Sequence, residues 1–506
     1  MSRRPRSTFP LVALAVFAIL AALVSYAPLA IGAQPEGRVA GKSSQAAPAA
    51  VSSATLFLPA AGNTMEAVVQ VDATGRVHAA YSPASGDDNG TYWAHYAECA
   101  GDCDNAANWH GAAVGEVGPF GGYVRLALDP QGRPRMMWYR LSSTWDDGTY
   151  VYATCNSDCT DPTHWSETDV VSSPTSPDGR RFFALDPQGR PRFLYTDTSS
   201  GHSGTFYAFC DNDCTSIDPQ SGRADNWWEG VFHPSYLLYD FLLTFNSAGG
   251  PRLAYTVSSS QRSLLYAECD NTCYDGDNWR QTTLPVAAET AYSFSLRLDS
   301  SGRPRLGFYS GYTGDEQYDR RLYYLYCQSG CTTSSNWKAL DLGLAAYSGL
   351  SVDLAIDSQN RPHLAYYVDA DPFGLQYAEC TSNCESTAAN WQVQWIETSE
   401  QLTASNPVPT ELGCSISVWF AGMKPSVALD GQGNPHFGYD AEHTQGGTCT
   451  AHTDIELVRY AQLGSSGPPA TLTQIPTRAP TRTPAAPPPL TPVSGRYRAL
   501  LPIVRR

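Results

Sequence analysis

Seven polar positions along the chain offer the residue types from which a binding or catalytic site is built. Each lies six residues before an Asp or Asn that begins a repeated turn: Glu66, Tyr123, Arg180, Asp240, Ser293, Ser351 and Lys424. Arg125 and Asp353 follow two residues later in their copies, on the same side of an alternating strand. Side chains of both charges gathered around one opening of the protein favour binding of a polar ligand. Paired carboxyls could also act on a glycosidic bond.

These positions lie just before a sequence motif, here called the phrase, that occurs seven times and of which ALDPQGRPRMMWY at 127–139 is typical. Alternating apolar residues on both sides of a Gly-containing turn predict two strands, A and B. The aromatic and Trp-initiated stretches that follow predict strands C and D. A repeat of this length must stack on its neighbours to bury its apolar face. The sequence therefore predicts an all-β fold, a seven-bladed β-propeller of four-stranded antiparallel blades. The copies are anchored at Asp72, Asp129, Asp186, Asn246, Asp299, Asp357 and Asp430.

The last copy lacks its strand D, and a segment at the other end of the chain resembles the missing piece. Residues 51–72 align with 278–299, which makes 54–59 the expected strand D of the last blade. A ring closed in this way leaves no exposed sheet edge.

All fourteen cysteines can be paired. Six blades carry a C-x-x-x-C loop, and a metal site there is unexpected because each loop offers two thiols and no recurring His. Cys414 and Cys449 lie in loops that the predicted strand directions bring to one face. Complete pairing is typical of a secreted protein. The expected disulfides are Cys99–Cys103, Cys155–Cys159, Cys210–Cys214, Cys269–Cys273, Cys327–Cys331, Cys380–Cys384 and Cys414–Cys449.

The two ends of the chain differ from the repeats in composition. Residues 1–33 combine arginines, an apolar stretch and small residues, which predicts a signal peptide, with an uncleaved membrane anchor as the alternative. A flexible leader is expected at 34–50 and the propeller at 51–463. A Pro/Thr-rich linker follows at 464–495 and a short apolar and basic tail at 496–506. A secreted or cell-surface location follows from these features.

The net charge of the chain is −16, and both ends outside 51–463 are positive, so the predicted propeller is more acidic still. This charge argues against nucleic acid as a partner of the propeller. It permits Ca²⁺, but DDNG at 87–90, WDDG at 145–148 and DADPFG at 369–374 do not complete a calcium loop. We therefore expect no cofactor and a monomer that contacts a membrane only through an uncleaved N-terminal segment.

The repeated phrase resembles that of secreted bacterial propellers grouped with the sialidase-like and BNR-repeat proteins, over about 54–463. The resemblance implies the fold, and it implies an arginine group that grips a carboxylate, a Tyr/Glu nucleophile pair and an acid Asp. Two departures are clear: seven copies occur instead of six, and the S-x-D-x-G-x-x-W box is absent. In this sequence the resemblance implies that Arg125, Arg180 and Lys424 bind the carboxylate of the ligand. It implies Tyr123 with Glu66 as the nucleophile pair, and Asp353 or Asp240 as the acid.

Three functions stay open at this point. The favoured one is a non-catalytic module that binds a glycan or an extracellular protein on the face of the B–C and D–A loops, because those loops vary while the scaffold repeats. The alternatives are a sialidase-like glycoside hydrolase and a structural component of the cell envelope. The sequence contains no G-x-S-x-G, H-E-x-x-H or phosphate-loop motif that would favour another enzyme class.

Overall fold

The computed structural model describes residues 54–464, with gaps at 60–61, 87–89, 119–121, 143–147, 174–181, 200, 221, 223, 234–237, 258–262, 287–290, 311–320 and 343–347. The predicted signal peptide, the leader and the C-terminal tail lie outside the described residues, as does the linker after Gly464. None of the helices within the described part of the chain has the length and apolar character that a bilayer crossing requires.

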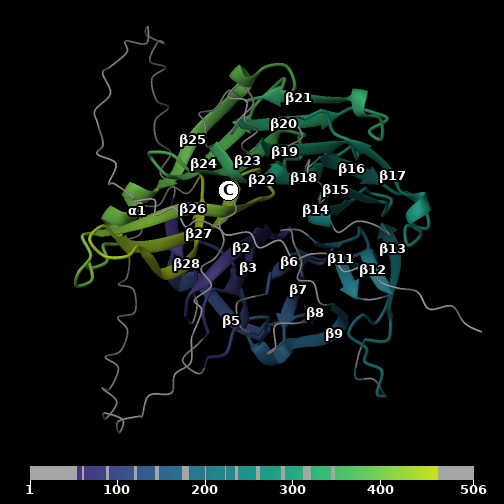
Figure 1. The fold of residues 1–506 in the computed structure, drawn as a ribbon, viewed down its shortest axis with the longest axis horizontal. Coiled ribbons are helices and arrows are strands. Elements are labelled where there is room, and N and C mark those ends of the chain that lie inside the picture. The colour runs from purple at the N-terminus through teal and green to yellow at the C-terminus, as the bar shows by residue number, and fades with distance from the viewer. Residues whose placement is uncertain are drawn as a thin grey trace, which may run out of the picture. The chain divides into compact units, whose positions relative to one another are not determined.

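The described strands form seven four-stranded antiparallel sheets around a ring, which confirms the predicted seven-bladed propeller (Figure 1). Each of the first six blades is one continuous piece of chain. Blade one contains β2 (Thr64–Val71), β3 (Val77–Pro83), β4 (Trp93–Cys99) and β5 (Trp109–Glu116), and blade two contains β6 (Arg125–Leu128), β7 (Pro134–Leu141), β8 (Gly148–Cys155) and β9 (Trp165–Ser173). Blade three contains β10 (Phe183–Leu185), β11 (Pro191–Ser199), β12 (His202–Cys210) and β13 (Trp227–His233).

The remaining blades follow in the same order. Blade four contains β14 (Leu238–Phe245), β15 (Pro251–Val257), β16 (Leu264–Glu268) and β17 (Arg280–Thr283), and blade five contains β18 (Ala291–Leu298), β19 (Pro304–Ser310), β20 (Arg321–Cys327) and β21 (Trp337–Asp341). Blade six contains β22 (Ser348–Ile356), β23 (Pro362–Val368), β24 (Gly374–Cys380) and β25 (Trp391–Thr398). Short 3-10 turns precede five of the D strands, at Ala106–Asn108, Pro162–His164, Gly276–Asn278, Ser334–Asn336 and Ala388–Asn390.

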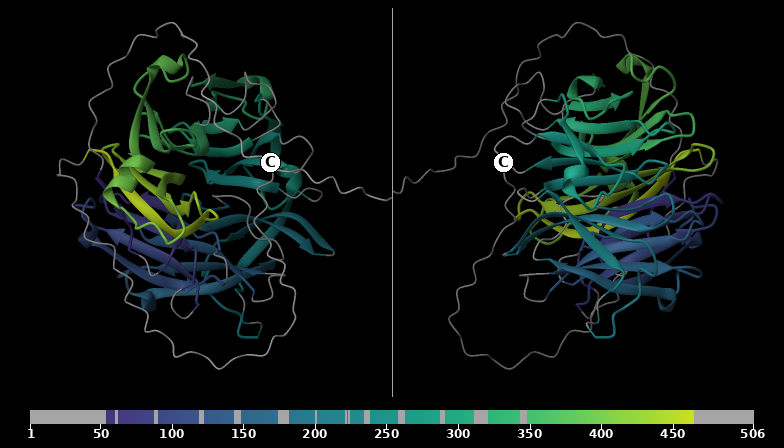
Figure 2. Two further views of the ribbon diagram at one scale, coloured as in Figure 1. Left: turned by 60° about the vertical axis from the view of Figure 1, so that its left-hand side comes forward. Right: turned by 90° about the vertical axis from the view of Figure 1, so that its right-hand side faces the viewer.

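Blade seven joins the two ends of the ring. It contains β26 (Ile416–Leu429), β27 (Pro435–Gly446) and β28 (His452–Gln462), and its outer strand is β1 (Ala54–Phe57) from the start of the described chain. Ala54 pairs with Gln462 and Phe57 with Arg459, so the expected closure is confirmed. Figure 2 shows the yellow blade seven beside the purple blade one.

The repeated Asp and the basic residue of strand B have structural roles. Asp129 accepts bonds from the backbone N–H groups of Gln131 and Arg133, both at 3.0 Å, and so holds its own turn. Arg135 then donates to Asp129 at 2.7 Å and to the carbonyl of Cys155 at 2.6 Å. The turn is thereby tied to the disulfide loop of the same blade, and Asp186 and Asp299 make the same kind of link with Arg192 and Arg305.

All seven expected disulfides are present, from Cys99–Cys103 to Cys414–Cys449. In the six short loops the Trp that begins or precedes strand D donates its indole N–H to the carbonyl of the second Cys, as Trp109 does to Cys103 at 3.0 Å. The disulfide and the Trp therefore shape one loop together. A set of seven disulfides is consistent with an extracellular protein.

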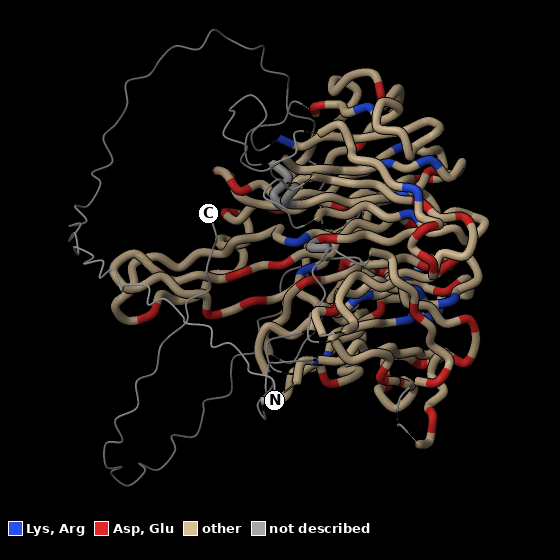
Figure 3. The backbone as a smooth tube through the Cα atoms, turned by 45° about the vertical axis from the view of Figure 1, so that its right-hand side comes forward, with Lys and Arg blue, Asp and Glu red and all other residues tan. Residues whose placement is uncertain are grey.

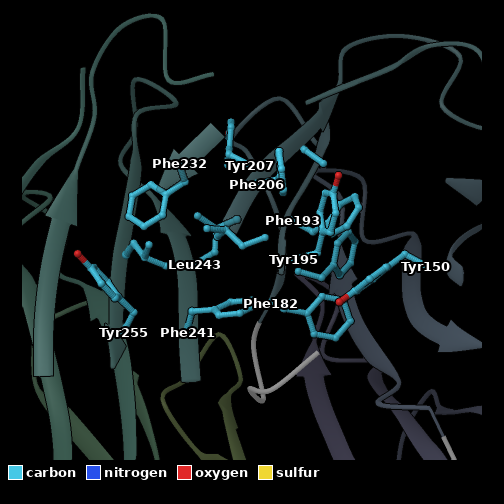
Figure 4. Close-up of a cluster of buried hydrophobic side chains, with 14 of the residues drawn as sticks. Tyr150, Phe182, Phe193, Tyr195, Phe206, Tyr207, Phe232, Phe241, Leu243 and Tyr255 are labelled. Atoms are coloured by element: carbon cyan, nitrogen blue, oxygen red, sulfur yellow. The ribbon is translucent and has the colours of Figure 1, made fainter. Parts of the chain in front are cut away.

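The apolar core lies between neighbouring blades, where the facing sheets present Tyr, Phe and Leu side chains to each other. Figure 4 shows the largest such cluster, which runs from Tyr150 in blade two through Phe193 in blade three to Phe241 in blade four. Rings in this cluster meet at centroid distances such as 5.2 Å for Tyr150 and Phe193. This packing fixes each blade against the next and makes the ring a rigid support for its loops.

Candidate functional site

The inner strand of each blade contacts the inner strands of its two neighbours, and together they surround the axis of the ring. They enclose a cavity of about 260 Å³. Most of the residues that line it are apolar, such as Leu126, Leu243 and Phe294. The charged side chains that line it are Glu66, Arg125, Arg297, Asp353 and Lys424, of which four were predicted from the repeat position.

Glu66 and Lys424 are aimed by irregular backbone at the junction of blades one and seven. Both adopt left-handed conformations, with φ of 58° and 46°, which non-Gly residues rarely occupy without compensation. The pairing register shifts at both places, between Met65 and Val68 and on both sides of Met423. Such bulges re-aim a side chain out of the regular alternation. Here the bulges bring the carboxylate of Glu66 and the ammonium group of Lys424 together.

Asp440 supports this junction from the neighbouring strand β27. Its Oδ1 accepts the backbone N–H of Glu66 at 2.6 Å, which anchors the strained residue. In blade one the equivalent position is Ser82, whose hydroxyl accepts the N–H of Val124 at 3.0 Å. Asp440 therefore takes over an inter-blade contact that a hydroxyl makes elsewhere, and it adds a buried negative charge.

The charges at this junction form a network. Lys424 Nζ lies 3.5 Å from Glu66 Oε1 and 3.4 Å from Asp440 Oδ2. Arg125 Nη2 lies 3.2 Å from the other oxygen of Glu66. The Glu66 carboxylate is thus shared between two cations. The guanidinium of Arg125 is buried, and its ion pair is with a residue of the same protein.

Two further carboxyls complete the group. Glu442 and Glu456 face each other across β27 and β28 as Cα partners. Burial raises the pKa of Glu456 to about 7, and Glu442, Asp440 and Glu66 act in the same direction against the opposing effect of Lys424. Burial also raises the pKa of Glu442. We call Glu66, Asp440, Glu442 and Glu456, together with Lys424, the carboxylate cluster.

The raised pKa of Glu456 makes stability depend on pH. Because its pKa rises from an ordinary 4.5 to about 7 on folding, the folded state holds the proton more tightly, and the free energy of unfolding falls as pH rises between these values. We expect Glu456→Gln to raise the unfolding temperature at about pH 8 and to change it little at about pH 4. Calorimetry at both pH values measures this, with Glu400→Gln on the exposed helix surface as control. Equal shifts at both pH values would contradict the assignment.

The other predicted residues have different environments. Asp353 accepts bonds from Ser295 Oγ at 2.7 Å and from the backbone N–H of Val427 at 2.9 Å, so it connects three blades. Tyr123 lies beside Arg125, whose Cζ is 5.7 Å from its ring centroid. Asp240 is half-buried in β14. Arg180 lies outside the described residues.

The structure thus brings Glu66, Arg125 and Lys424 into one network, with Tyr123 at its edge. The sequence reasoning missed Asp440, Glu442 and Glu456. A signal for Asp440 exists, because the other copies place Ser82, Arg140, Thr196, Thr256, Ser310 or Val368 after the aromatic residue at the end of the phrase, and only blade seven places a carboxyl there.

Blade seven also contains a Ser, His and Asp arrangement, formed by Ser417, His443 and Asp454. Ser417 Oγ lies 2.8 Å from His443 Nε2, and His443 Nδ1 lies 2.6 Å from Asp454 Oδ1. This order of atoms is that of a catalytic triad. Ser417 Oγ, however, donates to the carbonyl of Val408 at 2.7 Å, and His443 is fully buried. We assign these side chains to bracing β26 against β27, β28 and the loop before β26.

The helix beside this brace helps to cover it. α1 (Ser399–Ser405) begins at Thr398, which forms a capping box with Gln401. Thr403 of the helix accepts the N–H of Trp419 at 2.9 Å, and Trp419 donates its indole N–H to the carbonyl of Asn406 at 2.8 Å. The long connection between blades six and seven is therefore ordered against blade seven.

Neither a protein-family model nor a curated protein matches the chain. Among solved structures, a protein of unknown function from Dyadobacter fermentans is 13% identical, with 82% of this chain and 98% of that chain covered and a TM-score of 0.42. The intramolecular trans-sialidase of Ruminococcus gnavus is 11% identical, with 78% and 94% covered and a TM-score of 0.36.

The alpha-L-arabinofuranosidase Arb93A of Fusarium graminearum is 10% identical, with 62% of this chain and 92% of that chain covered and a TM-score of 0.39. The seven-bladed fold is shown by the sheets of this chain itself. These distant likenesses assign it no activity or ligand.

Proposed function

We propose that this propeller is an extracellular, non-catalytic binding module for a neutral glycan, and that the glycan binds at the carboxylate cluster. The observation that carries the proposal is the convergence of four carboxyls and one lysine at the junction of blades one and seven, beside the central cavity. Export directed by residues 1–33 and attachment through the C-terminal residues belong to the same proposal.

The chemistry of the cluster fits hydroxyl donors. A carboxylate accepts several hydrogen bonds, and bonds to charged groups are the stronger ones. Glu66, Glu442 and Glu456 are only partly buried, so they are accessible, while Asp440 is fully buried and holds the backbone beneath them. Strain at Glu66 and Lys424 supports a functional role, because such backbone persists where its surroundings enforce it.

The same charges disfavour an acidic sugar. Arg125 is bound to Glu66, and Arg297 lies 3.7 Å from Asp353, so both guanidinium groups already face carboxylates. An anionic ligand would have to displace these pairs and approach an acidic surface. Figure 3 shows Asp and Glu spread over the propeller. The sialidase-like hydrolase is therefore the second candidate, and the raised pKa of Glu456 is what favours it, since a proton donor needs such a pKa.

A glycan array with the full chain tests the proposal. The array carries neutral and sialylated glycans, and two quantities are measured on it: retained protein and lost terminal sugar. We expect retention on neutral glycans without loss of sugar. Glu442→Gln should weaken that binding by about tenfold or more, as expected for losing a hydrogen bond to a charged group.

Asp158→Asn is the matched control, because Asp158 is an exposed acid of a disulfide loop on the opposite face. Circular dichroism checks that both variants fold. Loss of sugar that stops in Glu456→Gln would replace binding by hydrolysis as the function. An empty array would overturn the glycan assignment and direct the search to a protein partner or a structural role.

A further inference from the structure

The junction between blades three and four carries exposed aromatic side chains far from the carboxylate cluster in the chain. Trp228 is 67% exposed and Tyr274 is 54% exposed. Val231 and Ile217 of blade three are exposed as well. Of the six exposed large apolar residues among the described part of the chain, these four belong to 217–274. Exposed apolar surface marks interaction sites where it is contiguous.

The repeats provide an internal comparison for both aromatics. The residue that follows the loop Trp is polar in the other five blades that have this loop, where it is His110, Ser166, Arg280, Lys338 or Gln392. The residue that follows the second Cys is also polar elsewhere, where it is Asp104, Thr160, Thr215, Thr332 or Glu385. The scaffold therefore does not need Trp228 or Tyr274, and both replacements fall at one junction.

Backbone packing holds the two aromatics on one surface. Trp228 is the Cα partner of Phe209 across β12 and β13. The ring of Phe209 is stacked with that of Tyr274, with centroids 6.0 Å apart and planes at 21°. A Cβ atom at Gly230 would collide with the carbonyl oxygen of Tyr274, and one at Gly276 would lie 2.7 Å from that of Val231. The two glycines thus permit blade four to lie directly against β13.

A cavity of about 370 Å³ adjoins this surface, and that volume is within the range of small-ligand sites. Its apolar wall includes Phe232 and Trp279, whose ring centroids are 4.8 Å apart, and Phe232 is visible in Figure 4. Its polar lining comes from His233, Asp275, Asp277 and Gln281. Aromatic faces beside carboxylate and amide groups suit a sugar ring, which has apolar C–H faces and a rim of hydroxyls.

We propose that the junction of blades three and four is a second carbohydrate site, specific for neutral sugars and separate from the carboxylate cluster. Trp228 and Tyr274 stack on sugar rings, the Asp277 carboxylate accepts hydrogen bonds from sugar hydroxyls, and the Gln281 amide nitrogen donates hydrogen bonds to them. The carboxylates of Asp275 and Asp277, which line the cavity, disfavour acidic sugars. Residues from two blades build the site, and the polar residues at the equivalent positions of other blades confine it to this junction.

Affinity electrophoresis of the full chain tests this site, with gels that contain mannan, xylan, galactan or mixed-linkage β-glucan. We expect at least one polysaccharide to retard the protein. Trp228→Ala should weaken that retardation by about tenfold or more, as expected for an aromatic anchor, and Trp228→Phe should retain part of it. Leu412→Ala is the matched control, because Leu412 is fully exposed elsewhere.

Glu442→Gln separates the two proposals, since it changes the carboxylate cluster and leaves this junction intact. Retardation that persists in Glu442→Gln and disappears in Trp228→Ala supports the second site, whatever the array shows for the first. No retardation of the wild type, or equal retardation of Trp228→Ala, overturns it. Sedimentation completes the test, because a dimer that dissociates in Trp228→Ala would make this surface a contact between two copies and would also overturn the proposal.

Discussion

Replacing Arg459 with methionine is expected to destabilise the propeller by about 3–5 kcal/mol, the usual cost of breaking a buried ion pair. Arg459 is fully buried in β28. Its Nη2 lies 2.6 Å from Glu397 Oε1 and its Nε lies 2.7 Å from Oε2, so the contact is bidentate. Burial opposes the charge of the guanidinium, yet Glu397 raises the pKa of Arg459 above its ordinary value. Chemical denaturation followed by fluorescence measures the loss.

The network around Arg459 explains why the expected effect is large. Arg459 also donates to Thr55 Oγ1 at 2.9 Å, and Tyr439 donates to Glu397 at 2.7 Å, so the pair links blade six, blade seven and the N-terminal strand β1. Removal of the Arg459 guanidinium leaves the carboxylate of Glu397 buried without its cation. The double variant Arg459→Met with Glu397→Leu should therefore recover most of the loss.

Arg280→Met is the control for this experiment. Arg280 pairs with Glu268 and Asp270 but is 59% exposed at its side chain, and exposed pairs contribute about 0–1 kcal/mol. If Arg459→Met and Arg280→Met cost the same, the buried network does not hold the closure together.

Replacing Leu56 with alanine is expected to destabilise the propeller by about 2–5 kcal/mol, as core Leu→Ala changes do. Leu56 lies in β1 and is 1% exposed, and it packs in a cluster with Val458 and Tyr460 of β28. Its loss weakens the strand that covers the outer edge of blade seven. Thermal unfolding measures the change, and sedimentation at rising concentration reports any association through the uncovered edge.

Leu412→Ala makes the same chemical change at a fully exposed position and should stay within about 0.5 kcal/mol of the wild type. A similar small effect for Leu56→Ala would show that β1 is dispensable for the ring.

The repeats made the fold predictable. Each copy of the phrase supplies the same strand pair around a turn that begins with Asp or, in blade four, Asn246, and six of the seven blades add the same disulfide loop, so an interpretation of one copy applies to the others. The closure by β1 was predictable for a related reason, because the last copy lacks a strand that residues 54–57 can supply. Pairing of Cys414 with Cys449 followed from the alternation of strand directions.

The candidate site was only partly predictable. A position six residues before the turn led to Glu66 and Lys424, but regular alternation gives no indication of the bulges that turn them toward each other. Glu442 and Glu456 could not be found from the repeat, because Glu442 follows the end of the phrase and Glu456 lies in strand C, which the phrase does not include. The family resemblance implied Asp353 or Asp240 as the acid, and the repeat gave no sign that the oxygens of Asp353 accept bonds that join blades.

The pairing of β1 with β28 has a consequence for how the chain reaches its final form. β1 is the first described strand and β28 the last, so loop closure spans nearly the whole described chain and the ring cannot be sealed until β28 has been made. By contrast, six of the disulfides join cysteines four residues apart and can form as soon as each blade emerges. Long-range pairing is slow because the entropy of closing a long loop opposes it. The blades can therefore be oxidised one by one before β1 pairs, and closure of the ring follows once β28 is present.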